Sequence, residues 1–144
     1  MDQIVVAVDG SQHSAKVVDF AAQLARSIPA SVILVNVIPD PHVPSGYVEY
    51  TKVEGVDPAA YYEQVSRVIL ESMGSRLKKA GVSYQITADT GNPATFILDV
   101  AKRKKASMIV VGVFGLHHLG RIRSLGSVSR RVAENSTIPV VLVP

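Results

Sequence analysis

The residues of this chain best suited to chemistry are one carboxylate and one glycine-rich segment. Asp9 follows the apolar run IVVAV and precedes Gly10 and Ser11. A later apolar run leads into VVGVFGLHHLGRIRSLGSVS, which contains four glycines. Glycine permits positive φ and lets main-chain N–H groups approach a ligand with no Cβ in the way. This pattern favours a site in which the main chain, rather than catalytic side chains, contacts the ligand.

The end of the glycine-rich segment is suited to an anion. Gly126, Ser127 and Val128 precede a short helical pattern, and a helix N-terminus offers free N–H groups and a positive dipole end. The Ser127 hydroxyl can either donate to phosphate or cap the helix. Asp9 repels phosphate, but it can accept bonds from sugar hydroxyls or hold a Mg²⁺ that bridges to phosphate. The alternative is that these glycines serve turns alone.

Strands and helices must alternate to position these residues. Short β-branched runs predict strands at 4–8, 32–37, 84–87, 108–111 and 140–143, and apolar spacings of three and four predict four intervening helices. Four of the runs are almost continuously apolar, as in strands covered on both faces, whereas residues 83–87 alternate and predict an edge strand. The fold class is therefore α/β, a single doubly wound, five-stranded parallel sheet with helices on both faces.

The predicted sheet brings the carboxylate and the glycines together. Ligands of open α/β sheets bind beyond the carboxyl ends of the strands, where the strand order reverses. If the fourth strand returns beside the first, Asp9 and Gly112 end neighbouring strands. The chain contains no Gly-Lys dipeptide, and no G-x-G-x-x-G follows the first strand, so neither a Walker A loop nor a dinucleotide fingerprint is present.

Composition limits the class of protein. The 144 residues, 47% of them hydrophobic, predict one domain over residues 1–144. The chain has no cysteine, its apolar runs are shorter than the ~18 residues of a membrane span, and its first residues are not a signal peptide, so we expect a cytoplasmic protein. The net charge is +3, and the basic run 102–105 lacks interleaved aromatics. We expect no nucleic-acid and no membrane partner.

The last predicted strand is apolar on both faces and lies at an edge of the sheet. An apolar edge without charges invites pairing with another chain unless something covers it. Two-fold pairing with the same strand of a second copy would cover it. We therefore expect a homodimer through Val140–Val143.

These features resemble the universal stress protein family over the whole chain. The resemblance is carried by IVVAVDGS, LVNVIPD, STIPVVLVP and, above all, by Gly112-x-x-Gly115 … Gly126-Ser127. It implies strand order 3-2-1-4-5, a dimer and, in one branch of the family, ATP binding. The family motif is G-x2-G-x9-G-S/T. Here ten residues, 116–125, separate the second and third glycines, and an apolar Val113-Phe114 pair fills positions that are often polar in ATP-binding members.

The resemblance also implies roles for individual residues. Asp9 would contact ribose or metal, and the main chain of Val37 would contact adenine. The ribose and phosphates would be approached by Gly112, Val113 and Gly115, and the phosphates bound by Gly126, Ser127 and Val128. With the turn residues Gly10 and Ser11, these form the predicted site for ATP, with Mg²⁺ as a possible companion.

The sequence thus predicts an ATP-binding regulatory module of the stress response. Two alternatives remain open: a nucleotide-free dimerisation or signalling module of the same family, and a weak ATPase. The chain offers no arranged nucleophile and base, and no lysine in the glycine-rich segment. Turnover is therefore expected to be weak or nil.

Overall fold

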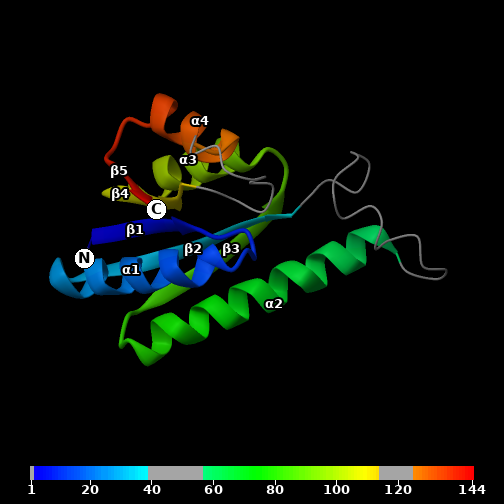
Figure 1. Ribbon diagram of the computed structural model, residues 1–144, viewed down its shortest axis with the longest axis horizontal. Coiled ribbons are helices and arrows are strands. Elements are labelled where there is room, and N and C mark those ends of the chain that lie inside the picture. Colours follow the sequence, from blue (N-terminus) through cyan, green and yellow to red (C-terminus); the bar gives the residue numbers. More distant parts are fainter. Residues whose placement is uncertain (1, 39–56, 114–124) are drawn as a thin grey trace.

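Strands and helices alternate along the chain (Figure 1), as the sequence predicts. The computed structural model describes residues 2–38, 57–113 and 125–144. The elements are β1 (Asp2–Ala7), α1 (His13–Ser27), β2 (Ala30–Ile38), α2 (Pro58–Lys79), β3 (Tyr84–Thr90), α3 (Pro93–Arg103), β4 (Met108–Gly112), α4 (Ser127–Asn135) and β5 (Val140–Val143). β5 has the predicted bounds. β2, β3 and β4 extend beyond the predicted ranges 32–37, 84–87 and 108–111, and β1 begins two residues earlier and ends one residue earlier than the predicted 4–8.

The five strands form one sheet in the order β3-β2-β1-β4-β5, and every neighbouring pair is parallel. This confirms the predicted strand order. The reversal of order falls between β1 and β4, which pair through Ile4 with Met108 and Val6 with Val110. The strand predicted to alternate, β3, lies at one edge and is mostly exposed, and β5 lies at the other.

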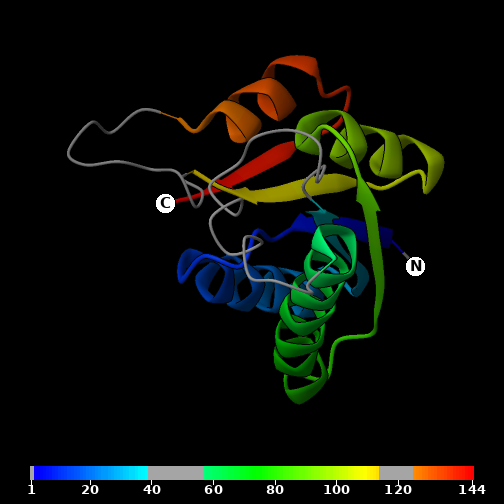
Figure 2. The ribbon, with the colours of Figure 1, turned by 90° about the vertical axis from the view of Figure 1, so that its right-hand side faces the viewer.

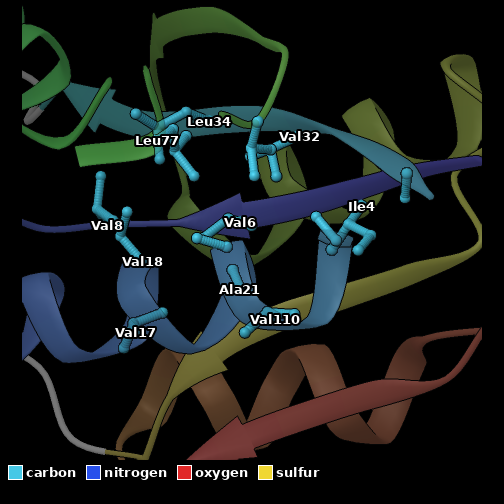
Figure 3. Close-up of a cluster of buried hydrophobic side chains, with 14 of the residues drawn as sticks. Ile4, Val6, Val8, Val17, Val18, Ala21, Val32, Leu34, Leu77 and Val110 are labelled. Atoms are coloured by element: carbon cyan, nitrogen blue, oxygen red, sulfur yellow. The ribbon is translucent and has the colours of Figure 1, made fainter. Parts of the chain in front are cut away.

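Helices cover both faces of the sheet because alternate strand residues point to opposite sides. Ile4 and Val6 pack with the side chains of α1 and α2, whereas Val5 packs with those of α3 and α4. Figures 1 and 2 show the two helical layers on either side of the strands. Figure 3 shows the first cluster, in which β1 and β2 meet residues such as Val18 and Leu77. This double coverage explains the almost continuous apolar runs of the central strands.

Helix ends follow local chemistry. The Asp57 carboxylate accepts a bond from Ala59 N at 3.2 Å where α2 begins. Asn92 Oδ1 accepts from Thr95 N at 3.1 Å at the start of α3, with Pro93 as the first helical residue. Asn92 is therefore the N-cap of α3, and Pro93 suits the first helical position because it has no N–H to leave unpaired. Gly81 follows the end of α2 with φ +75°, a conformation that favours glycine and ends the helix.

Candidate functional site

The carboxyl edge of the sheet brings together the predicted site residues that the structure describes. Continuing the β1–β4 register by three residues beyond Val6 and Val110 places Asp9 level with Val113. Gly126 N donates to Val113 O at 2.9 Å, so the start of α4 lies at the same place. Gly115 lies outside the described residues. The fold therefore gathers the two ends of the glycine-rich segment beside the end of β1.

Asp9 organises the turn between β1 and α1. Its Oδ1 accepts bonds from Ser11 N at 2.9 Å and from Ser14 Oγ at 3.1 Å. Ser14 Oγ in turn accepts from Asp9 N at 3.3 Å. The carboxylate therefore has a structural role besides any contact with a ligand.

Gly10 is required by the same turn. Its φ is +84°, and a Cβ built there would lie 2.7 Å from Ile69 Cδ1 on α2. Real side chains do not approach so closely, and L-residues rarely adopt this φ. The positive φ by itself explains the glycine in this predicted site, and the approach of Ile69 on α2 adds to the cost of a side chain there.

Asn36 ties the end of β1 to β2. This buried side chain donates from Nδ2 to Val8 O at 2.8 Å, while Val8 N donates to Val35 O at 2.9 Å. Val35 therefore turns its main chain toward β1. Because strand residues alternate, Val37 turns its main chain the same way, beyond the end of β1 at Ala7. This orientation is the one that a main-chain contact at Val37 requires.

The glycine-rich segment begins and ends at the main chain of Val113. Val113 O accepts from Gly126 N at 2.9 Å and from Ser129 Oγ at 3.1 Å. Val113 N donates to Val143 O of β5 at 2.9 Å. Both main-chain groups of Val113 are therefore fixed, and the segment between Val113 and Gly126 leaves and returns at one point.

The N-terminus of α4 has no side-chain cap. The N-cap residue is Gly126, with φ −61° and ψ 158°, and Ser127 is the first helical residue. Of the two roles considered for Ser127, capping is therefore not the one adopted. Any residue can adopt the φ and ψ of Gly126, so the backbone conformation does not require glycine there. Glycine differs from other residues at this position by having no side chain near the first-turn N–H groups. An N-cap side chain normally binds the first-turn N–H groups, and Gly126 has no side chain to do so.

Sequence reasoning missed the buried polar side chains of this edge, Ser14, Asn36 and Ser129, which are 3%, 5% and 3% exposed. Each makes a hydrogen bond at a strand end, as buried polar groups must. One signal was available. An asparagine inside the apolar run VILVNVI needs a partner, which points to a tertiary hydrogen bond at that position. The two serines carry no comparable signal.

Residues 2–38, 57–113 and 125–144 contain neither a side-chain metal cluster nor a membrane-spanning helix. Within these ranges, no three His, Asp or Glu side chains gather closely enough to hold a metal ion by themselves. Across the same ranges, none of the helices combines the length and apolar character needed to cross a bilayer. The residues gathered at the carboxyl edge therefore remain the candidate site.

A doubly wound parallel sheet whose strand order reverses between β1 and β4 defines the class of open α/β proteins, in which ligands bind beyond the carboxyl ends of the strands at that reversal. The model of the universal stress protein family matches residues 1–144. The chain belongs to this family.

Similar proteins agree with this assignment. The chain is 33% identical over 148 aligned positions to the universal stress protein YxiE of Bacillus subtilis (strain 168), covering 99% of this chain and 98% of that protein. Among solved structures, the universal stress protein of Archaeoglobus fulgidus in complex with dAMP is 28% identical with a TM-score of 0.68, covering 100% of this chain and 98% of that one. A universal stress protein in complex with cAMP is 27% identical with a TM-score of 0.68, covering 99% and 96%.

Proposed function

We propose that the protein is an ATP-binding regulatory module of the stress response that acts as a homodimer in the cytoplasm. The observation that carries this proposal is the fixed entry and exit of the glycine-rich segment, Gly126 N to Val113 O at 2.9 Å, beside an uncapped helix N-terminus. Helix N-termini of this kind bind phosphate through main-chain N–H groups. Family members solved with dAMP and with cAMP give independent support.

Each part of the nucleotide has a proposed partner. The phosphates lie at the N–H groups of Gly126, Ser127 and Val128, while Gly112, Val113 and Gly115 approach ribose and phosphate. Asp9 accepts from the ribose hydroxyls, supported by the turn that includes Gly10 and Ser11. The main chain of Val37 contacts adenine, with the orientation described above.

A Mg²⁺ ion fits this arrangement only as part of the nucleotide complex. The described residues hold no cluster of three metal-binding side chains. Mg²⁺ is commonly held by one or two carboxylates together with phosphate oxygens and water. Asp9 supplies one carboxylate, so we propose that any Mg²⁺ is bound with ATP and bridges its phosphates to Asp9.

We propose that the protein binds ATP and does not hydrolyse it efficiently. Phosphoryl transfer needs cations on the transferred group and a residue that orients the nucleophile. The segment 112–128 contains arginines but no lysine, and the β1–α1 turn offers Asp9 as its carboxylate. Asp9 Oδ1 is engaged by Ser11 and Ser14, which fixes the turn.

The test is an equilibrium titration. Nucleotide released from the purified protein is identified first, and ATP, AMP, dAMP and cAMP are then titrated with and without Mg²⁺. Asp9→Asn keeps an Oδ1 acceptor for Ser11 N and Ser14 Oγ but removes the charge, so we expect ATP–Mg²⁺ affinity to fall about tenfold or more with folding intact. Asp99→Asn on α3 makes the same change far along the helix from this edge and should bind as the wild type. No retained nucleotide and no binding at millimolar ATP would overturn the proposal.

The proposed dimer uses β5. Pro139 O and Val143 O accept from β4, at Ile109 N and Val113 N. Because strand residues alternate, Val140 and Leu142 turn their main-chain groups away from β4, toward the edge that no described strand occupies. Antiparallel pairing of two β5 strands would join these groups across a two-fold axis.

Two substitutions test this interface by sedimentation. Val141→Glu places a charge in the apolar edge strand, and Leu142→Pro removes one outward N–H while leaving the bonds to β4 in place. We expect both to shift the mass from dimer to monomer. Ile86→Glu on the opposite edge strand, where Ile86 is 51% exposed, is the matched control and should remain dimeric. A dimeric mass in both β5 variants would exclude this interface.

A further inference from the structure

The carbonyl of Val143 joins three elements that are far apart in the sequence. It accepts from His13 Nε2 at 2.8 Å and from Val113 N at 2.9 Å. A carbonyl oxygen has two lone pairs, and these two bonds use both. Because a carbonyl can only accept, the imidazole carries a hydrogen on Nε2. The end of β5 is therefore held by the first residue of α1 and by the residue that enters the glycine-rich segment.

The bonds continue from this carbonyl into both halves of the proposed nucleotide site. Val113 O holds Gly126 N at 2.9 Å, at the N-terminus of α4. On the other side, His13 is followed by Ser14, whose hydroxyl donates to Asp9 Oδ1 at 3.1 Å. His13 therefore links the turn that holds Asp9 to the end of β5. The end of β5 in turn links His13 to Val113 and, through it, to the start of α4.

We propose that His13 is a positioning residue that couples the nucleotide site to the β5 edge through the carbonyl of Val143. The inference rests on the proposed function, because it assigns a link between the nucleotide and the dimer. A nucleotide held at Asp9 and at the start of α4 fixes both ends of this chain of bonds. The end of β5 is then fixed as well, and it is this strand that pairs in the dimer. By linkage, dimerisation tightens nucleotide binding by the same factor.

Three variants separate the bond from the packing of the ring. His13→Phe keeps a ring of similar size but removes the donor. His13→Gln keeps an N–H donor at the end of a side chain of similar reach. Lys16→Gln, at an exposed position on the same helix, is the control for a change on α1.

The first measurement needs no nucleotide. Amide hydrogen exchange is followed at Val113, whose N–H shares the Val143 carbonyl with His13. We expect faster exchange in His13→Phe, by about three- to tenfold, which is the range of one neutral hydrogen bond. His13→Gln and Lys16→Gln should exchange as the wild type. Unchanged exchange in His13→Phe would overturn the positioning role.

The second measurement is the effect of ATP–Mg²⁺ on the dimer dissociation constant. In the wild type we expect ATP to lower the dimer dissociation constant. In His13→Phe we expect the factor by which ATP lowers this constant to fall toward one, and the affinity for ATP to be about three- to tenfold weaker. His13→Gln should restore both. A purely structural histidine would lower thermal stability but leave the ATP-dependent factor unchanged, and that result would overturn the coupling.

The outcomes also separate this inference from the proposed function. If the wild type binds ATP and His13→Phe keeps the full effect of ATP on the dimer, the proposed function stands and the coupling role of His13 is excluded. A wild type that binds neither ATP nor AMP overturns the proposed function and the coupling together, while the exchange at Val113 still decides whether His13 positions the entry of the segment.

Discussion

The start of α4 is the place where one added side chain tests the proposed phosphate contact most directly. Gly126→Asp puts a carboxylate at the N-cap, where the main chain has φ −61° and ψ 158°. These torsions suit aspartate, and Asp is among the preferred N-cap residues. The protein should therefore fold as well as the wild type, with a stability change of a few tenths of a kcal/mol.

The expected effect on ATP has two parts. The new side chain takes first-turn N–H groups that would otherwise bind phosphate, and its charge repels the phosphate. Two unit charges at about 4 Å repel by ~1 kcal/mol in water and by ~4 kcal/mol at an effective dielectric constant of about 20. We expect Gly126→Asp to weaken ATP binding by about 100-fold or more. Gly126→Asn caps the helix without the charge and should cost about tenfold, the value of one to two hydrogen bonds.

Isothermal titration with ATP at several salt concentrations separates these parts, because the difference between the Asp and Asn variants should shrink as salt screens the repulsion. Asn92→Asp adds the same charge at the N-cap of α3, beyond the edge strand β3, and controls for long-range repulsion. ATP affinity in folded Gly126→Asp within about threefold of the wild type would show that the phosphates do not lie at this helix.

Two further predictions concern stability. Gly10→Ala should destabilise the protein by about 2–3 kcal/mol in urea unfolding, because it combines the cost of positive φ with the 2.7 Å approach to Ile69 Cδ1. Gly81→Ala, at φ +75° with open space around it, should lose only the backbone part, about 1 kcal/mol. Adding Ile69→Val to Gly10→Ala should recover part of the difference, and equal losses of stability at both glycines would exclude the contact with α2. The hydrogen bond from Arg76 lowers the pKa of Asp19 below its usual 3.8, so this pair stabilises the fold above that pH and the stabilisation is lost as the pH falls toward the lowered value. Asp19→Asn should therefore cost little at neutral pH, because the two side chains are 55% and 44% exposed, and the difference from the wild type should vanish in acid; a difference that persists at low pH would contradict the ion pair as its cause.

The fold could be predicted from the sequence because most of its elements carry a clear apolar pattern. The buried stripe of α2 is less visible in the sequence, for a physical reason. It includes Ser66 and Gly74, which do not register as apolar. Gly74 is buried because the Tyr84 ring lies 2.7 Å from where its Cβ would be. A stripe made partly of small and polar residues follows from the neighbouring strand, which no local pattern reveals.

The site could be predicted only in outline. Asp9, Gly112 and Gly126 lie at the carboxyl edge, where the sequence places them, because strand ends and the reversal of strand order follow from topology. The hydrogen bonds that hold them depend on partners distant in sequence: Asn36 on Val8, and His13 on Val143, 130 positions away. Such pairs leave no periodic signal, and they become visible only when the strands are in register.

The buried side chains that fix the main chain at this edge are uncharged. Ser14, Asn36 and Ser129 are neutral, and the hydrogen bonds of Asn36 and Ser129 go to main-chain carbonyls at the ends of β1 and β4. They fix the main chain without placing a compensating charge beside the start of α4. The bond from Gly126 N to Val113 O fixes the start of α4 against the end of β4 without any ligand. Both main-chain groups of Val113 are taken by Val143, Gly126 and Ser129, so Val113 serves this edge by holding the end of β5 and the start of α4 in place.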